Sequence, residues 1–207
     1  LAEAAQQQAK QLLAQIIDGD PVPTLVIDAS HAVTHWNRAC EQILGLPAAA
    51  MVGTRRQWEA FYDSERPILA DLIVSGTVDE IIGVYGGKNL RRSQVIAGAY
   101  EAEGYFAHLG DNGRWLQFTA APLFDQHGKV IGAVETLIDI TERKQAEASL
   151  QQAHDELEQL VEKRTSQLAK AKQALAEDAE LRQNSEEALR QRDADLSTAH
   201  ARLLKLQ

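Results

Sequence analysis

The stretch that decides the fold runs from residue 114 to residue 144 and reads RWLQFTAAPLFDQHGKVIGAVETLIDITERK. It holds two largely apolar segments, 114–124 and 129–138, and a third such segment, 101–109, precedes them. The connections, Asp111-Asn112-Gly113 and Asp125 to Gly128, have the Asn/Asp-then-Gly chemistry of hairpin turns. The sequence therefore predicts three consecutive antiparallel strands.

Two further strands are predicted nearer the N-terminus, at 23–28 and 33–36, and Asn37 then caps a helix that ends at Gly45. Apolar residues recur at helical spacing in residues 1–17, and again in short pieces at 67–73, 78–85 and 90–96. Together these elements predict an α+β fold. Its centre is a five-stranded antiparallel sheet with short helices on one face, preceded by an N-terminal amphipathic helix.

The C-terminal third has a different composition, with no glycine, proline, Phe, Trp or Tyr after Gly132. Since glycine and proline punctuate turns, this region is predicted to form one helix of about 100 Å. Its leucines follow two heptad registers, and a four-residue stutter between Leu157 and Leu168 separates them. A lone helix of this length cannot bury its apolar stripe, so we expect a dimeric coiled coil; the alternative is a solvated helix stabilised by ion pairs. We therefore predict a flanking helix at 1–19, a globular domain at 20–140 and a coiled coil at 141–207.

Composition also excludes several classes of function. The formal net charge of −9 argues against nucleic acid and against a basic membrane-binding surface. The single cysteine, Cys40, excludes a disulfide framework or multi-thiolate metal site and is typical of a reducing compartment. With no apolar run of about 18 residues and no signal peptide, we expect a cytoplasmic location and no membrane contact by this chain. Because it starts at Leu1 rather than Met, we expect it to be part of a longer protein, which can itself be membrane-anchored.

Residues 20–144 resemble a PAS domain. The resemblance is carried by the hairpin from Trp115 to Gly132, by the junction Asp139-Ile-Thr-Glu-Arg-Lys144, and by the run WNRA at 36–39 after the second strand. PAS domains are sensory and dimerisation modules, mostly of bacterial signalling proteins. The resemblance implies a ligand cavity between helices and sheet, a homodimer through the flanking helices, and output through the C-terminal coil.

The resemblance therefore implies a sensory module of a two-component system, whose C-terminal effector is a histidine kinase. Residues 199–207 resemble the approach to a kinase dimerisation helix. Two alternatives stay open, namely the sensor module of a diguanylate cyclase and a ligand-free PAS dimerisation adaptor. The chain carries no P-loop, no His-Glu-x-x-His and no Gly-x-Ser-x-Gly, so we expect no enzymatic activity in this part of the protein.

The sequence does not predict the identity of the ligand, but it offers candidate ligand-binding residues. They are four aromatic residues and two arginines: Trp58, Tyr62, Tyr100, Trp115, Arg91 and Arg92. A guanidinium group facing the cavity would select a carboxylate or a phosphate. The competing interpretation is that the aromatic residues are packed core and the arginines are solvated or ion-paired.

Known PAS cofactors are not supported by the sequence. A haem-binding PAS domain would need an axial histidine in the helical segment, here residues 50–100. A flavin-linked photosensor would need a cysteine in the same segment. Residues 50–100 contain neither histidine nor cysteine. We expect no metal site, because His31 and His35 lie on a turn and a strand where their spacing does not give a shared face. Cys40 is predicted to be a small buried hydrophobic residue.

The junction between the last strand and the long helix is the predicted route of signal transmission. Asp139 and Thr141 lie at this junction, and in the PAS family it couples the core to the coil. Thr141 is also predicted to cap the start of the helix. The two roles are compatible.

Overall fold

The computed structural model describes residues 2–204, with side chains from residue 3 to residue 197. The chain divides into two compact units, Leu1–Ala146 and Glu147–Gln207. Within the described range, no helix is both long enough and apolar enough to span a membrane.

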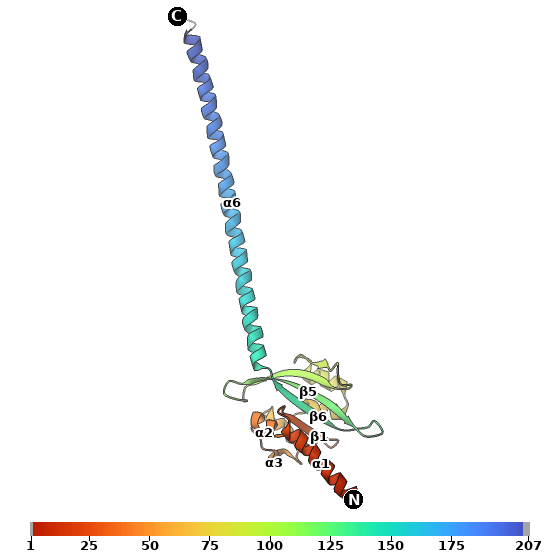
Figure 1. Cartoon of the computed structure of the whole chain (residues 1–207). Coiled ribbons are helices and arrows are strands. Elements are labelled where there is room, and N and C mark those ends of the chain that lie inside the picture. The colour runs from red at the N-terminus through yellow and green to blue at the C-terminus, as the bar shows by residue number, and fades with distance from the viewer. Residues whose placement is uncertain (1, 205–207) are drawn as a thin grey trace. The chain divides into compact units, whose positions relative to one another are not determined.

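The first unit is built on an antiparallel sheet with the strand order β2-β1-β6-β5-β4-β3 (Figure 1). Its strands are β1 (Thr24–Asp28), β2 (Val33–Trp36), β3 (Arg91–Arg92), β4 (Tyr100–Phe106), β5 (Arg114–Phe124) and β6 (Val130–Asp139). The two predicted hairpin turns are present, with Gly113 and Gly128 in the left-handed region at φ 73° and 78°. The predicted α+β class and antiparallel sheet are confirmed.

The sheet has six strands rather than the predicted five. The additional strand, β3, lies within residues 90–96, where a short helix was predicted, so that prediction was wrong. Arg91 pairs with Glu101 and Arg92 with Tyr100, both on β4. The open edge of β4 supplies backbone hydrogen-bond partners that a single isolated helical turn would lack.

The helices of the first unit are short, except for the one at the N-terminus. They are α1 (Ala2–Gly19), α2 (Arg38–Leu44), α3 (Ala48–Met51), the 3₁₀ turn η1 (Gln57–Ala60), α4 (Leu69–Ser75) and α5 (Val78–Tyr85). Helix α4 packs against β1, β5 and β6, so it covers the centre of the sheet. The strand residues that face this helical layer are buried, as Leu25, Phe118 and Leu137 illustrate.

Asn37 joins the start of α2 to the first strand. Its Oδ1 atom accepts hydrogen bonds from Cys40 N at 2.9 Å and from Thr24 N at 3.0 Å. Its Nδ2 atom donates to the carbonyl oxygens of Ile17, Asp20 and Val22. The predicted N-cap is confirmed, and the same side chain also fixes the segment that leads from α1 into β1.

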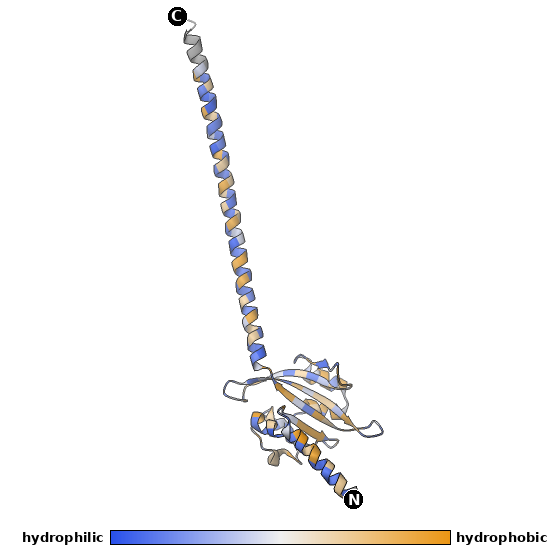
Figure 2. Ribbon diagram, in the orientation of Figure 1, coloured by the Kyte–Doolittle hydropathy of each residue, from blue (hydrophilic) through white to orange (hydrophobic). Residues whose placement is uncertain are grey.

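Helix α6 (Thr141–Leu204) begins in the first unit and forms the whole described part of the second. The prediction of one long helix is confirmed. Its leucines are exposed, for example Leu157 at 58% and Leu168 at 71%, and Figure 2 shows apolar residues recurring among hydrophilic ones along α6. The pairing of this helix with a second copy stays a prediction. The kinase-like segment at 199–207 lies outside the residues whose side chains are described.

Candidate functional site

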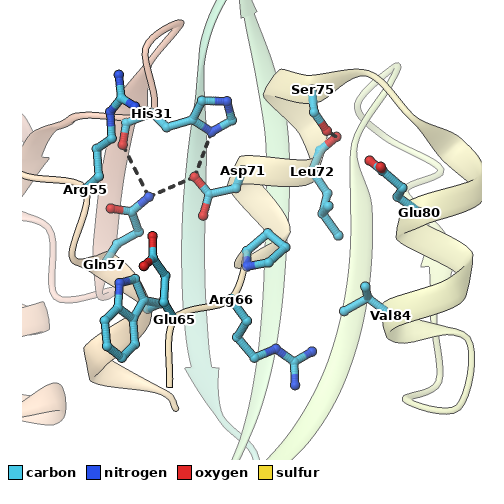
Figure 3. Close-up of a pocket in the computed structure, with 12 residues that line it drawn as sticks. His31, Arg55, Gln57, Glu65, Arg66, Asp71, Leu72, Ser75, Glu80 and Val84 are labelled. Carbon is cyan, nitrogen blue, oxygen red and sulfur yellow. Dashed lines mark hydrogen bonds and ion pairs between the residues drawn. The ribbon is translucent and has the colours of Figure 1, made fainter. Parts of the chain in front are cut away.

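A cleft of about 570 Å³ opens in the helical layer of the first unit (Figure 3). One wall comes from the loop around η1, and the other from α4 and α5, as Figure 3 shows. The lining residues are His31, Arg55, Gln57, Trp58, Glu65, Arg66, Pro67, Asp71, Leu72, Ser75, Glu80 and Val84. The volume lies within the range of small-molecule sites in proteins, about 300–1,000 Å³.

Asp71 organises one side of this cleft. Its Oδ1 atom lies 2.9 Å from His31 Nδ1 and accepts a hydrogen bond from Gln57 Nε2 at 2.8 Å. Its Oδ2 atom accepts from Ile68 N at 3.0 Å, at the start of α4. Three segments that are distant in sequence are therefore held together by one buried carboxylate. Sequence reasoning missed this role, although it did consider and reject His31 as a metal ligand.

The turn before β2 positions His31 for this contact. Asp28 Oδ1 accepts hydrogen bonds from Ser30 N at 2.8 Å and from Ala32 N at 3.0 Å. This turn holds His31 at φ 66°, in the left-handed region that few side chains adopt. Backbone strain of this kind clusters at functional sites, and His31 lies in the lining of the cleft.

The cleft carries charges of both signs. Arg55, Glu65 and Arg66 form no ion pair with any described residue, and Arg66 Cζ lies 4.1 Å from the centroid of the Tyr62 ring. Gln57 is buried. Among the buried side-chain polar atoms of the described residues, its Oε1 atom is the one without a hydrogen-bond partner. The cleft thus offers guanidinium donors and carboxylate acceptors, with the unsatisfied Gln57 oxygen buried in its wall.

The cavity next to the aromatic side chains between the helices and the sheet measures only about 10 Å³; it is lined by Phe61, Tyr62, Tyr85, Phe106 and Phe118, among others. This is about the minimum for one water molecule. The ligand cavity implied at this position is therefore closed in this structure, because the aromatic rings pack against one another in tilted and edge-to-face arrangements.

Glu135 lies at this closed interior and is 2% exposed. Its Oε2 atom accepts a hydrogen bond from Ala70 N at 2.7 Å. Burial raises the pKa of the Glu135 carboxyl to about 8; the Ala70 hydrogen bond opposes this shift and the nearby Asp71 charge adds to it. Sequence reasoning overlooked Glu135. The available signal was a carboxylate on the inward-facing positions of a strand, between Ala133 and Leu137.

The predicted transmission residues meet at the start of α6. Asp139 Oδ1 accepts from Thr141 N at 2.9 Å, and Asp139 Oδ2 accepts from Arg114 Nη1 at 3.1 Å. Thr141 Oγ1 accepts from Trp115 N at 3.0 Å, so its hydroxyl binds a strand amide and does not cap the helix as predicted. The Asp139 carboxylate, two residues before Thr141, instead binds the first amide of the helix. Burial disfavours its charged form, but the hydrogen bonds from Thr141 and Arg114 outweigh this effect and lower the pKa of Asp139.

A second link to α6 was not predicted. Glu103, on β4, is 5% exposed and pairs with Arg143 Nη2 at 2.8 Å and with Lys144 Nζ at 2.7 Å. Its own amide donates to Lys88 O at 2.8 Å, just after α5. Burial disfavours the Glu103 carboxylate, but the hydrogen bonds from Lys144 and Arg143 prevail and lower its pKa to about 2. Through its amide and its carboxylate, Glu103 connects the segment after α5 and the sheet to the first turn of α6.

The six predicted ligand-binding residues lie at several places. Trp58 lines the cleft and Tyr62 the closed interior. Arg92 Nε donates to the Tyr100 hydroxyl at 3.1 Å, and both line a separate hollow of about 300 Å³.

The other two predicted residues face the surface of the sheet. Arg91 is exposed and pairs with Glu101 at 2.8 Å. The centroid of the Trp115 ring lies 5.6 Å from that of the Tyr105 ring and 5.4 Å from Lys144 Nζ. The structure therefore does not bring the six residues together in one site.

Among the described residues, the cysteine and the groups that could hold a metal ion lie outside the cleft or are not grouped together. Cys40 is fully buried, as predicted, and burial raises the pKa of its thiol to about 12. In the part of the chain that the structure describes, no three His, Cys, Asp or Glu side chains are grouped so as to hold a metal ion.

Two family models, both described as PAS fold, match the chain at residues 11–72 and 92–145. No curated protein matches it significantly. Among solved structures, the PAS domain of BvgS from Bordetella pertussis is 20% identical, with 71% of this chain and 98% of that chain covered and a TM-score of 0.43. A sensory box sensor histidine kinase from Vibrio cholerae is 11% identical, with coverages of 68% and 98% and a TM-score of 0.35. An RNA-binding light-oxygen-voltage receptor is 19% identical, with coverages of 71% and 38% and a TM-score of 0.49.

Proposed function

This chain carries a PAS sensory domain, and on that premise we propose that it binds a small molecule and transmits the signal through a dimeric coiled coil to a C-terminal effector. The observation that carries this proposal is the junction between sheet and output helix. Glu103 pairs with Arg143 in the first turn of α6, and Asp139 accepts a hydrogen bond from the amide of Thr141, where α6 begins. Arg114, on the neighbouring strand β5, donates to Asp139. A change in the sheet therefore has a direct physical path into the helix.

The cleft in the helical layer is the proposed receiving site. It has the volume of a ligand site, and its wall includes α4, which packs on β5 and β6. Helix α4 is also bound through Ala70 N to Glu135 on β6, the strand that leads into α6. A ligand that favours one position of α4 would thereby favour one arrangement of the strand and helix that follow.

A second receiving site is proposed at the hollow where Arg92 and Tyr100 meet. The Arg92 guanidinium suits a small carboxylate or phosphate. If such an anion binds there, Arg92→Ala should weaken it about tenfold to a hundredfold, while Arg91→Ala, whose side chain pairs with Glu101, serves as the matched control. Titration with acetate and inorganic phosphate measures this; unchanged affinity in Arg92→Ala would dismiss the hollow.

The proposed output element is α6. PAS domains commonly dimerise, and the exposed leucines of α6 recur at heptad spacing, so a second copy of the same helix is the simplest cover for them. We place the module in the cytoplasm of a bacterium, with a histidine kinase as the effector.

Two measurements on the purified 207-residue chain test the proposal. Light scattering should give the mass of a dimer, and mass spectrometry under non-denaturing conditions should find a small molecule bound to it. A monomer at concentrations of about 100 μM would contradict output through a coiled coil, since a stable coil of this length should associate far more tightly.

The ligand-free dimerisation adaptor is a second candidate, and the nearly filled space between helices and sheet favours it. The two functions differ in one result. A dimer that carries no small molecule, and that gains no thermal stability from any tested metabolite, would be an adaptor rather than a sensor.

A further inference from the structure

We infer that the cleft of the first unit binds a zwitterionic amino acid with an apolar side chain. The inference rests on the proposed sensory function, because it names the class of ligand that the receiving site takes. It is carried by the juxtaposition of an unpaired carboxylate, Glu65, and an unpaired guanidinium, Arg66, beside an apolar wall.

The two charges are directed to different parts of the cleft. Figure 3 shows the Glu65 carboxylate on the side of Gln57 and the Arg66 guanidinium on the side of Val84. They are adjacent in sequence, yet they form no ion pair with each other. A ligand with one positive and one negative group can therefore satisfy both side chains at once.

Arg66 is held ready for a carboxylate. Its guanidinium lies 4.1 Å from the centroid of the Tyr62 ring, and this cation–π contact restricts the orientation of an otherwise flexible side chain. The planar group keeps its N–H edges available, and their geometry matches a carboxylate in a bidentate contact. A restricted arginine loses less conformational entropy on binding than a free one.

The opposite side of the cleft offers acceptors for an ammonium group. Glu65 supplies a carboxylate that forms no ion pair with any described residue. The neighbouring Gln57 amide is held by its Nε2 atom, which donates to both His31 O and Asp71 Oδ1, and its Oε1 atom is buried rather than open to the cleft. The two Glu65 oxygens are therefore the acceptors for an ammonium group, which carries three donors.

The rest of the cleft wall is apolar and selects an apolar side chain on the bound amino acid. Leu72 is buried, Val84 is half-buried, and Trp58 and Pro67 complete this surface. An aliphatic or aromatic side chain would gain roughly 25 cal/mol for each Å² of apolar surface removed from water there.

Ligands with charge of only one sign fit this cleft less well. A dicarboxylate or a phosphate would meet the carboxylates of Glu65 and Glu80, and a simple amine would meet the guanidinium groups of Arg55 and Arg66. Like charges near one another reduce affinity, and the mixed lining therefore discriminates in favour of a zwitterion.

Isothermal titration of the 207-residue chain with three probes tests the ligand class. L-leucine carries both charges, isoamylamine is its analogue without the carboxylate, and isocaproate is its analogue without the ammonium. We expect L-leucine to bind at least about tenfold more tightly than either analogue. The inference is overturned if either analogue equals L-leucine, or if leucine, isoleucine, valine, methionine and phenylalanine all fail to bind.

Charge-removing variants then assign each contact. Arg66→Gln should weaken L-leucine about tenfold to a hundredfold without weakening isoamylamine, from which it removes a like charge; Glu65→Gln should weaken L-leucine without weakening isocaproate, for the same reason. Arg56→Gln is the matched control, since Arg56 pairs with Glu59 at 2.7 Å and does not line the cleft. Equal effects of Arg66→Gln and Arg56→Gln would contradict a contact with Arg66.

Failure of the ligand class and failure of the sensory function give different results. If no amino acid binds but mass spectrometry finds another small molecule on the protein, the ligand class is wrong and the sensory function stands. If neither amino acids nor any copurified molecule binds, both are wrong.

Discussion

Arg143, in the first turn of α6, donates to Glu103 on β4 at 2.8 Å, although 40 residues separate the two in sequence. Lys144 contacts the other carboxylate oxygen of Glu103 at 2.7 Å. The output helix is therefore tied to the sheet by a nearly buried carboxylate as well as by its covalent connection to β6. This tie gives the junction a side-chain component that can be tested apart from the backbone.

Replacing Glu103 by Gln should loosen the start of α6. We expect a loss of about 1–3 kcal/mol in the free energy of unfolding at pH 7, because two charged partners lose their carboxylate. The pKa of Glu103 is lowered to about 2, so its stabilisation is present above about pH 4.5 and is lost as the pH falls toward 2. Urea unfolding of both proteins at pH 7 and pH 3 measures this, with Glu101→Gln as the control on the same strand. An equal difference at both pH values would show that Glu103 is held by packing rather than charge.

Glu135→Gln should have the opposite pH dependence. Burial raises the pKa of Glu135 to about 8, so the ionised carboxylate destabilises the fold, progressively from about pH 4.5 to pH 8 and fully above it. The variant should match the wild type near pH 5 and be the more stable protein at pH 9, since each pKa unit corresponds to about 1.4 kcal/mol. Urea midpoints followed by circular dichroism between these pH values test this. Parallel curves for the two proteins would show that Glu135 does not titrate in this range.

Leu157→Lys combined with Leu168→Lys should abolish the dimer and leave the first unit folded. Both leucines are exposed on α6 of the single chain, and a lysine in a coiled-coil seam buries charge without a partner. Light scattering reports the mass, and near-ultraviolet circular dichroism reports the packing of the first unit. Gln159→Lys combined with Ala169→Lys adds the same charge at positions outside the seam and should remain dimeric. A double leucine variant that stays dimeric would refute pairing through this seam.

Asp139→Ala and Thr141→Ala should uncouple the ligand from the output. Asp139 bridges Arg114 and the Thr141 amide, and the Thr141 hydroxyl binds the Trp115 amide, so each variant removes a contact between β5 and α6. We expect nearly unchanged ligand affinity, with activity held at one level in the protein that retains its native effector. The measurement is effector activity with and without ligand, and a response over the full wild-type range in both variants would show that the coupling does not depend on Asp139 and Thr141.

Much of the fold could be predicted from local chemistry. The hairpin turns at Gly113 and Gly128, the cap at Asn37 and the uninterrupted helix after Ile140 each depend on residues close in sequence, and each is present. The prediction failed at residues 90–96. There an apolar pattern at helical spacing was overridden by pairing with β4, a partner that local spacing cannot reveal.

The candidate site was much less predictable. Trp58 was identified, but Glu65, Arg66 and Gln57 were not, because the sequence does not show which polar side chains of this segment line a cleft. The sequence left open whether the aromatic residues line a ligand cavity or are packed core, and the nearly filled interior agrees with packed core for Tyr62. Whether aromatic side chains line a cavity or fill it depends on how their volumes fit together across the sheet and helices.

The sequence by itself determined the hairpin turns, the cap at Asn37 and the long uninterrupted helix α6, because turns, caps and periodicity act over a few residues. Only the tertiary structure decided which charges meet and which stay unpaired. Glu103 finds Arg143, Asp71 finds His31, and Glu65 and Arg66 remain free, because strand register and helix docking place side chains that are far apart in the chain. The candidate functions of this protein depend on those long-range placements.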